Sequence, residues 1–336
     1  MSVFRKCTKC DVIFAKDISF CPLCGGLLSH CEPNLSIAQY TFKEIKRGEI
    51  EITSYNGPDA DINVPSSING MTVVSIGKYA FANRNGIRSV ILPETVKVIK
   101  CDAFYNSSLT SIVLPNSIQS IGVADDDSLS GYIFNNEGHG AFEASRITSV
   151  TIPPSVKEIF PRAFAKCPLL SSVKFECNIK SIPESCFQEC RRLTTLDLPN
   201  SIQSIEEKAF ESSGLTTIKI PGSTKEIGSS CFRNCTRLSS VFLGNGIEEI
   251  SSGAFLNCSS LYKIAIPASV KKMDATAFQI THEYTCNTWA GPYGWMPEKR
   301  SCIDRTIKLY CQPGSYAMVF AASNNLDYDS IENWGS

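Results

Sequence analysis

The chain has 336 residues, 43% of them hydrophobic and 19% charged, so it can bury a core and is not expected to be disordered. Its formal net charge is −1, with 32 Lys and Arg against 33 Asp and Glu, which argues against a protein that coats nucleic acid through bulk charge. Apolar runs such as Tyr316 to Ala322 are far shorter than the ~20 residues that a membrane span needs. A cysteine motif follows the first residues directly, without an apolar signal region, so we expect a cytoplasmic protein with reduced thiols.

Residues 1–31 carry two C-x2-C pairs separated by ten residues. Two-residue spacing lets both thiolates of a pair reach one tetrahedral ion, and the spacer is long enough for a hairpin. The segment resembles a zinc ribbon, in which Phe-Cys-Pro-x-Cys-Gly is the usual second knuckle. We predict a structural Zn²⁺ site that is closed to substrate, because four thiolates complete the coordination sphere. The predicted ligands are Cys7, Cys10, Cys21 and Cys24.

Other interpretations of these cysteines stay open. An iron site of the rubredoxin type uses the same tetrahedral sulfur set, and the pairs could also be free dithiols. His30 and Cys31 follow closely and are possible alternative ligands. A module this small has almost no core, so binding of the metal should supply its folding energy. Residues 32–40 are expected to be a linker.

Residues 41–325 are predicted to form one repeat array, followed by a tail at 326–336. The dipeptide Ala-Phe or Cys-Phe recurs every 22 or 23 residues, apart from one gap of 38. A fixed period of this length is typical of a solenoid, whose stacked units bury a shared core. The repeated phenylalanines are Phe81, Phe104, Phe142, Phe164, Phe187, Phe210, Phe232, Phe255 and Phe278.

One unit reads L-x-x-I-x-L-P-x-x-I/V-x-x-I-x-x-x-A-F-x-x-C-x-x, as in the segment from Leu238 to Cys258. The I-x-L alternation has period two and predicts a strand with one face inward, which the proline then ends. The units resemble BspA-type leucine-rich repeats, with segments like the usual first and last units near Ile50 and Thr306. The resemblance implies an α/β repeat solenoid of the bacterial type, with a parallel sheet on its concave face, that mediates protein contacts without catalysis.

Two columns of the repeat are expected to be structural. Cysteines stand three residues after several of the phenylalanines, where a buried thiol acts as a small apolar group. Asparagines stand two residues after others, and we interpret them as residues that satisfy the turn backbone rather than as glycosylation sites. The cysteines are Cys167, Cys190, Cys235 and Cys258, and the asparagines are Asn83, Asn106, Asn234 and Asn257.

The outward column of the strands is the predicted partner-binding stripe. Residues between the inward positions point out of the other face of each strand. The first outward column is almost uniformly Ser or Thr and is interpreted as structural, whereas the second varies from unit to unit. Ordinary exposed strand residues are the alternative interpretation. The candidate residues are Ile91, Val113, Thr151, Lys174, Asp197, Lys219 and Phe242.

Two insertions interrupt the repeat, near 123–140 and 279–305. The first holds an Asp125–Asp127 run without the alternating ligands of a calcium loop. The second is rich in aromatic residues and is expected to cap the open end of the array. It could instead be a specificity loop that Cys286 and Cys302 close.

No phosphate-binding, dinucleotide-binding or hydrolase motif is present, and no two of the three histidines have metal-ligand spacing. We therefore predict a non-catalytic scaffold that binds a protein partner on the concave face. The alternative is an adaptor or nucleic-acid-associated protein that acts through the ribbon. Nucleic acid is the weaker prediction, since residues 1–31 are only mildly basic and lack a stripe of basic and aromatic residues.

Overall fold

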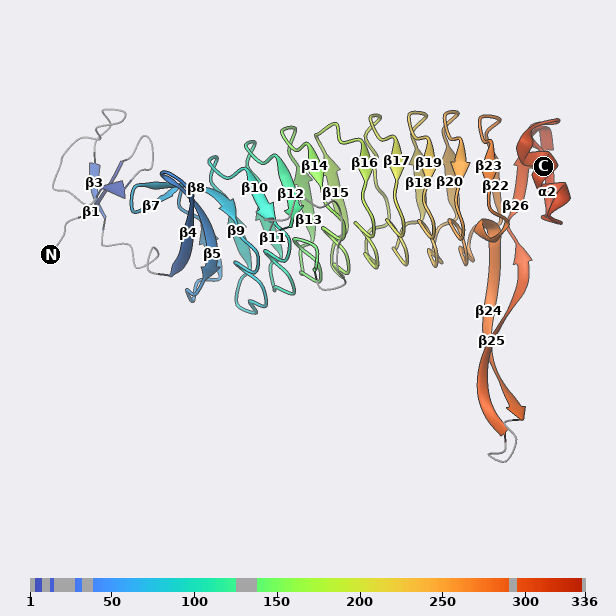
Figure 1. The fold of residues 1–336 in the computed structure, drawn as a ribbon, viewed down its shortest axis with the longest axis horizontal. Helices are drawn as coiled ribbons and strands as arrows, with labels where there is room; N and C mark the ends of the chain where they lie inside the picture. Colours follow the sequence, from blue (N-terminus) through green and yellow to red (C-terminus); the bar gives the residue numbers. More distant parts are fainter. Residues whose placement is uncertain are drawn as a thin grey trace. The chain divides into compact units, whose positions relative to one another are not determined.

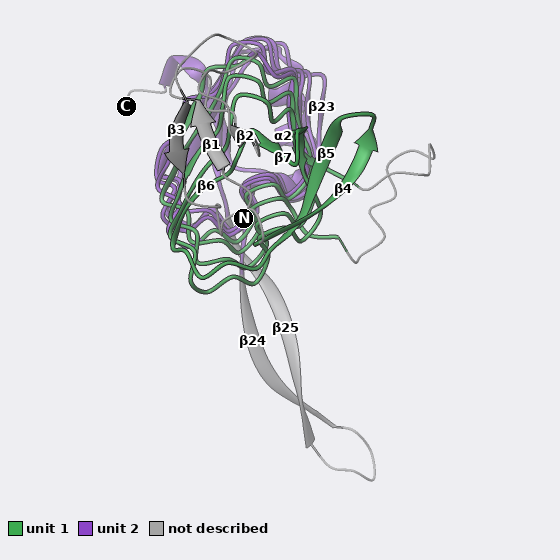
Figure 2. Cartoon of the chain, turned by 90° about the vertical axis from the view of Figure 1, so that its left-hand side faces the viewer, with its two compact units in different colours: residues 1–167, 173–177 green, residues 168–172, 178–336 purple. Residues whose placement is uncertain are grey.

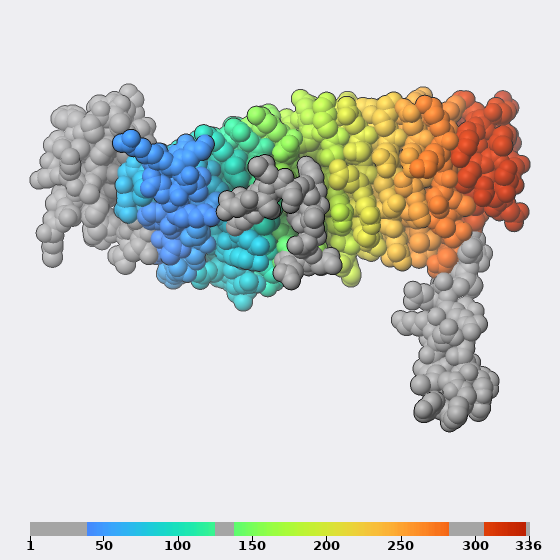
Figure 3. All heavy atoms as spheres, viewed as in Figure 1, coloured from blue at the N-terminus to red at the C-terminus, as the bar shows by residue number. Residues whose placement is uncertain are grey.

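The computed structural model describes the backbone of residues 4–7, 13–14, 28–31, 39–124, 138–289 and 295–333, and the side chains of 39–124, 138–281 and 306–333. The chain divides into two compact units (Figure 2). Unit 1 comprises residues 1–167 and 173–177, and unit 2 comprises 168–172 and 178–336. Both units are built from coils of the predicted repeat, and successive coils within a unit are in direct contact (Figure 3).

Three short strands form a separate antiparallel sheet at the start of the chain (Figure 1). They are β1 (Phe4–Cys7), β2 (Ile13–Phe14) and β3 (Leu28–Cys31), in the order β2-β1-β3. Cys7 is the last residue of β1, so the first cysteine pair begins where β1 ends. Cys10, Cys21 and Cys24 lie outside the described residues, as do the side chains of all four predicted zinc ligands.

Most coils contribute one strand to a first ladder, formed by the predicted L-x-x-I-x-L phrase, and the coil of Asp197 contributes a single bridge to Lys219. The pairing is parallel and in register, so equivalent residues of successive coils lie side by side. In unit 1 the strands are β6 (Asp61–Asn63), β9 (Ser89–Ile91), β11 (Ser111–Val113), β13 (Ser149–Ile152) and β15 (Ser172–Phe175). In unit 2 they are β18 (Thr217–Ile220), β20 (Ser240–Leu243), β22 (Lys263–Ile266), β26 (Lys308–Cys311) and β27 (Tyr328–Ser330).

A second parallel ladder runs through the mid-repeat isoleucines, which the sequence analysis did not predict. In unit 1 it joins β5 (Glu49–Tyr55), β8 (Met71–Ile76), β10 (Val98–Lys100), β12 (Ser120–Val123) and β14 (Glu158–Ile159). At its start β4 (Tyr40–Lys46) pairs antiparallel with β5, and β7 (Ser67–Ile68) with β8. In unit 2 it joins β16 (Ser181–Ile182), β17 (Ser204–Ile205), β19 (Glu226–Ile227), β21 (Glu249–Ile250) and β23 (Lys272–Met273).

The third side of each coil is a turn, which corrects the predicted α/β class to a β-solenoid. On this side the Phe104 N–H donates to Ala141 O of the next coil, and Asn106 N–H donates to Glu143 O. Amides that bond to a neighbouring coil are not available for the bonds to residue i−4 that a helix requires. Within the described residues the only α-helix is α2 (Tyr316–Ser323). Two separate 3₁₀ turns, η1 (Ala275–Phe278) and η3 (Ile331–Asn333), are the other helical elements described.

Left-handed backbone residues shape this turn and explain the asparagine column. Positive φ angles recur two residues before and two residues after the repeated phenylalanine. Asn83, Asn106, Asn234 and Asn257 all have φ between 49° and 62°, a region that asparagine tolerates better than most residues. Their amides also bond between coils, with Asn106 Nδ2 donating to Asn83 Oδ1 at 2.8 Å. The structural interpretation of this column is confirmed.

The repeated phenylalanines form the core of each unit. All nine are 0% exposed. In unit 1 the ring centroids of Phe81, Phe104, Phe142 and Phe164 follow one another at 5.0, 5.0 and 5.3 Å. In unit 2 those of Phe187, Phe210, Phe232 and Phe255 follow at 5.6, 5.3 and 5.3 Å. The inward assignment made from the repeat is therefore confirmed.

The cysteine column packs beside these rings and is buried. The Cys167 thiol donates to Phe142 O at 3.1 Å, and the Cys235 thiol donates to Phe210 O at 3.0 Å. Burial raises the pKa of Cys167 to about 12 and that of Cys235 to about 11, so both stay protonated. A protonated, buried thiol is a packing group with one weak hydrogen bond, as predicted.

The insertion at 279–305 is a hairpin arm, and the predicted cap is wrong. Its strands β24 (Gln279–Trp289) and β25 (Trp295–Thr306) pair with each other and with no other described strand (Figure 1). Cys286 lies opposite Glu298, and Cys302 lies opposite His282. The two cysteines are therefore offset by four residues, or about 13 Å, which is too far for a disulfide. The end of unit 2 instead carries β26, β27 and α2, and α2 contacts β23.

Candidate functional site: the outer face of the first ladder

The outer face of the first ladder consists of the outward residues of its strands. The exposure of these strands alternates as predicted, for example exposed, buried, exposed in β11. The seven predicted stripe residues are all exposed. Because equivalent positions are in register, the outer face presents one variable side chain for each coil, about 4.8 Å from the next.

In unit 1 the outer face is apolar on two neighbouring strands. Ile91 and Val113 lie side by side in register and are 47% and 54% exposed. Thr151 follows on β13 and Lys174 on β15, where the Lys174 ammonium is 2.6 Å from a Glu176 carboxylate oxygen. The structure thus places an exposed apolar pair beside polar residues.

In unit 2 the same column is mixed in charge and polarity. Asp197 lies opposite Lys219, and Lys219 lies opposite Phe242, whose ring is 57% exposed. The column continues with Ala265 on β22, opposite Tyr310 on β26. A small alanine therefore stands between two aromatic residues.

A hollow of about 470 Å³ includes Ala265 and continues past the carboxyl ends of β20, β22 and β26. Most of its lining is apolar, and Asn245, Ser269 and Gln312 supply polar groups. The lining residues are Leu243, Asn245, Ala265, Ile266, Pro267, Ala268, Ser269, Gln312 and Ile331. The sequence analysis missed this hollow because Gln312 and Ile331 come from the last segments of the chain.

Two ammonium groups lie beside this hollow on the outer face. Lys263, two residues before Ala265, and Lys308 on the neighbouring strand each lie 5.5 Å from the centroid of the Tyr310 ring. Lys308 also bonds Asp329, which raises the pKa of the lysine. Lys308 is thus paired with a carboxylate, and both ammonium groups lie near the Tyr310 ring.

A second hollow, of about 320 Å³, lies on another side of unit 2. The connection from Phe210 to Leu215 is one residue shorter than the connection from Phe187 to Leu193. Gly214 fills the shortened turn, where a Cβ atom would lie 2.1 Å from Arg191 O. The hollow is lined by Arg191, Ser212, Ser213, Gly214, Asn234, Thr236 and Arg237.

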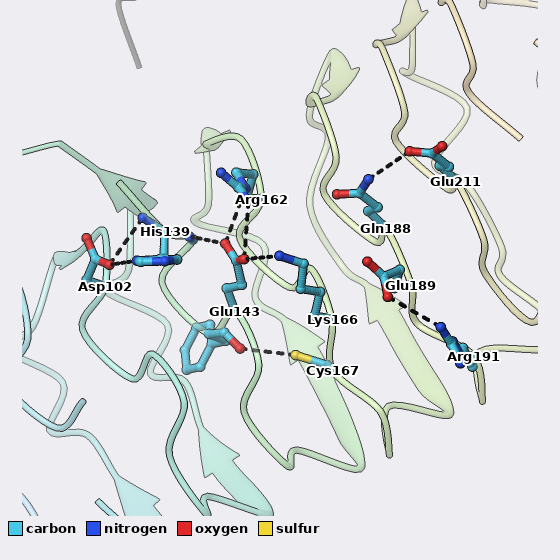
Figure 4. Close-up of polar contacts among 12 residues, drawn as sticks. Asp102, His139, Glu143, Arg162, Lys166, Cys167, Gln188, Glu189, Arg191 and Glu211 are labelled. Atoms are coloured by element: carbon cyan, nitrogen blue, oxygen red, sulfur yellow. Dashed lines mark hydrogen bonds and ion pairs between the residues drawn. The ribbon is translucent and has the colours of Figure 1, made fainter. Parts of the chain in front are cut away.

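Buried carboxylates in unit 1 form a third polar group (Figure 4). Asp102, 0% exposed, accepts from His139 Nδ1 at 2.8 Å and from the His139 backbone N–H at 3.1 Å. Glu143, 1% exposed, accepts from Lys166 at 3.1 Å and from Arg162 at 3.3 Å. The Asp102–His139 pair ties the coil before the insertion at 123–140 to the end of that insertion, of which 125–137 lie outside the described residues. Sequence spacing gave no signal for the Asp102–His139 pair, since 37 residues separate them.

Within the residues whose side chains are described, no group of three or more His, Cys, Asp or Glu is arranged to hold a metal ion. The predicted zinc ligands lie outside that part of the chain. No helix in the described residues is both long and apolar enough to cross a membrane.

The chain is similar to several solved structures. Curated proteins give no match. Among solved structures, a leucine-rich cell surface protein of Faecalibacterium prausnitzii is 25% identical, with a TM-score of 0.54, over 71% of this chain and 72% of that one. The T. pallidum leucine-rich repeat protein is 23% identical over 67% of this chain and 88% of that one, with a TM-score of 0.44. A Bacteroides ovatus leucine-rich repeat protein is 23% identical over 72% and 90%, with a TM-score of 0.36.

The family model for the BspA type leucine rich repeat region matches residues 60–169 and 158–285, which together span more than half of the chain. These residues hold the nine repeated phenylalanines, most strands of both ladders and the seven predicted stripe residues. The chain belongs to the BspA-type leucine-rich repeat family.

Proposed function

We propose that this protein is a non-catalytic scaffold that binds a protein partner on the outer face of the first ladder. The observation that carries the proposal is the exposure of Ile91, Val113 and Phe242 on strands whose inward neighbours are fully packed. Large apolar side chains exposed on a rigid frame lose little conformational freedom on binding and bury apolar area. Leucine-rich repeat proteins generally bind other proteins, which supports the proposal.

Three substitutions on the outer face test this function, Lys174→Glu, Lys219→Glu and Phe242→Asp. A control with the same change in net charge carries Lys157→Glu, Lys180→Glu and Gln203→Asp, all exposed where the chain leads into the second ladder. Wild type and both variants are used as bait in quantitative affinity purification from native lysate. We expect the wild type and the control to capture the same partner proteins, and the outer-face variant to lose them. Equal capture by all three proteins would refute the outer face as the binding surface.

We further propose that residues 1–31 form a structural zinc ribbon with Cys7, Cys10, Cys21 and Cys24 as ligands. Four cysteines in two closely spaced pairs are a donor set that fits tetrahedral Zn²⁺. Support comes from the antiparallel pairing of β1 with β2 and with β3, because the cysteine pairs lie at the end of β1 and between β2 and β3. The zinc would hold the module in its fold and take no part in chemistry. Metal analysis of the purified chain, with one zinc expected per chain, tests this assignment.

The cytoplasmic location of the protein also stays a prediction. Its support is the column of buried thiols, each placed to pack and none within a disulfide among the described residues. Fractionation of the native host, with detection of the chain in the soluble or the surface fraction, decides it.

A further inference from the structure

A short turn between two longer ones produces the hollow at Gly214. Five positions lead from Phe210 to Leu215, against six in the coils before and after, and no other repeated phenylalanine starts a short connection with a longer one on each side. The hollow of about 320 Å³ lies in the range of roughly 300–1,000 Å³ that is typical of small-molecule sites. Its floor carries no side chain at Gly214, because a Cβ atom there would lie 2.1 Å from Arg191 O.

The lining of this hollow is rich in hydrogen-bond donors. Among the described residues, it consists of two guanidinium groups, three hydroxyls, one carboxamide and Gly214, without a carboxylate. Arg237 makes no hydrogen bond or ion pair within the described part of the chain. Arg191 uses one nitrogen for Glu189 at 3.5 Å (Figure 4), in an exposed and therefore weak pair that leaves its other N–H groups available. An anion is the ligand that matches such a lining.

The amide of Asn234 supplies a donor that the repeat leaves without an acceptor. In the asparagine column, Nδ2 of one residue donates to Oδ1 of the residue one coil earlier, as Asn257 does to Asn234 at 3.3 Å. The residue one coil before Asn234 is Ser212, and no hydrogen bond joins these two side chains in the structure as described. Nδ2 of Asn234 is thus left for a ligand in the hollow that both residues line.

A buried hydroxyl at the floor has a poor partner of its own. Ser213 is 5% exposed, and its Oγ atom lies 3.3 Å from Cys235 Sγ. The Cys235 thiol already donates to Phe210 O, so the serine proton is directed at sulfur, which is a weak acceptor. An anionic oxygen is a much stronger acceptor for the same proton.

The donors come from three successive coils, which favours a tetrahedral oxyanion over a carboxylate. Arg191 belongs to the first coil, Ser212 and Ser213 to the second, and Asn234 and Arg237 to the third. The first and third coils are about 10 Å apart. The terminal oxygens of a phosphate or sulfate ester point in several directions, whereas the two of a carboxylate share one plane. No aliphatic or aromatic residue is in the lining, so a hydroxylated carrier such as a sugar fits better than a nucleobase or an apolar chain.

We infer that this hollow binds the phosphate or sulfate ester of a sugar, with Arg191 and Arg237 on opposite sides of the oxyanion. Ser213 donates to it from the floor and Asn234 from the third coil. The hollow lies on a different side of unit 2 from the outer face, so the inference is independent of the proposed function.

Isothermal titration calorimetry of the full chain, in chloride buffer without phosphate or sulfate, tests the inference. The ligands are the 6-phosphates and 6-sulfates of glucose, galactose and N-acetylglucosamine. We expect one molecule of at least one ester to bind per chain, about fivefold or more tighter than glucuronate, inorganic phosphate or AMP. The tighter series identifies the oxyanion. Absence of binding by all six esters, or equal or tighter binding of any of the three comparison ligands, would overturn the inference.

Removal of one guanidinium should abolish most of the affinity. Arg237→Ala breaks no contact within the described residues and should weaken binding of the ester by about tenfold or more. Arg146→Ala is the matched control, because Arg146 is an exposed arginine in the short turn of a unit 1 coil and does not line the hollow. Its affinity should equal that of the wild type. Equal affinities for Arg237→Ala and wild type would show that the hollow is not the binding site.

A second variant fills the hollow without a change of charge. Ser212→Asn places the usual column residue where φ is 57°, and its Oδ1 atom is expected to accept from Asn234 Nδ2. The variant should keep its fold, which circular dichroism checks, and should weaken ester binding by roughly threefold or more. Ala144→Asn makes the corresponding change at a φ of 59° in unit 1 and should leave the affinity unchanged. An affinity that Ser212→Asn leaves unaltered would argue against ligation by Asn234 and overturn the assigned geometry.

Discussion

The coils and the first 31 residues meet the same difficulty by different means. Neither a single coil nor a 31-residue module can bury enough apolar surface to fold alone. The coils obtain their stability from neighbours, since within each unit the phenylalanine rings of successive coils stack with centroids 5.0 to 6.3 Å apart. The first 31 residues hold two short antiparallel pairings and five cysteines, four of them in the two C-x2-C pairs, so we expect a metal ion to replace the missing core. We therefore expect stability to be shared along the coils but concentrated at one ion in the module.

Removal of the metal should have the largest effect. Binding of structural zinc contributes ~10–16 kcal/mol in zinc-finger peptides, so a chelator is expected to unfold residues 1–31 completely. Hydrogen exchange resolved by mass spectrometry should show lost protection in residues 1–31 and retained protection in residues 39–333. Cys31→Ala is the control and should keep the zinc. If residues 1–31 keep their protection from exchange after the chelator is added, their stability does not depend on a metal, and the contrast with the coils is wrong.

Truncation of one core ring should have the next largest effect. Phe187→Ala or Phe232→Ala leaves a cavity in a fully packed stack and should lower the free energy of unfolding by ~3–5 kcal/mol. Phe242→Ala is the matched control, because the same residue type stands on the outer face, and it should change the value by less than about 0.5 kcal/mol. Denaturant titration followed by circular dichroism measures all three. Equal midpoints for Phe232→Ala and Phe242→Ala would contradict the inward assignment.

The buried thiols should make unit 2 sensitive to alkali. The pKa of Cys235 is about 11 in the folded chain against an ordinary value of 9.0, so the folded state holds the proton more tightly. Stability is then full below pH 9 and falls as the pH rises toward 11, by about 1 kcal/mol for this thiol at pH 10. The difference between the urea midpoints at pH 8 and pH 10 should be smaller in Cys235→Ala than in wild type. An identical loss in both proteins would show that this thiol does not contribute.

The smallest expected effect is a gain in stability. Glu189 has a φ of 57° at the position where Asn234 and Asn257 stand in later coils. The left-handed backbone conformation is less favourable for glutamate than for asparagine, so Glu189→Asn should raise the free energy of unfolding by ~0.5–1 kcal/mol. Glu184→Asn, the same change at an exposed position that is not among the residues of positive φ, is the control. A loss of stability in Glu189→Asn would mean that the Glu189–Arg191 contact at 3.5 Å matters more than the backbone.

Much of this architecture can be predicted from the repeat. The strand phrase, the buried phenylalanines and the exposure of Lys219 and Phe242 all follow from period-two alternation and a regular spacing. The second ladder escaped prediction because most of its unit 2 strands, such as Ser204–Ile205, have two residues and show no alternation. The sequence also did not predict that the repeat lacks helices. Amides of the turn, such as Phe104 N–H, bond to the next coil, and the sequence of a single unit cannot reveal this.

The candidate site was less predictable than the fold. Ala265 belongs to the outward column, but the hollow beside it also needs Gln312 and Ile331, which follow the hairpin arm in sequence. The Asp102–His139 pair likewise joins a residue before an insertion to a residue at the end of that insertion. Such contacts depend on where the chain returns after an interruption, and the repeat period carries no information about that.

The edge strand β27 of the first ladder has features that disfavour stacking of another molecule on it. A pile of parallel coils has no intrinsic length, and its final row of open amides and carbonyls could accept another molecule to make a filament. Here β27 is only three residues long, its Asp329 bonds Lys308 of the preceding strand, and α2 lies against β23 in the other ladder. A short, charged terminus and a helix beside the neighbouring edge together disfavour polymerisation.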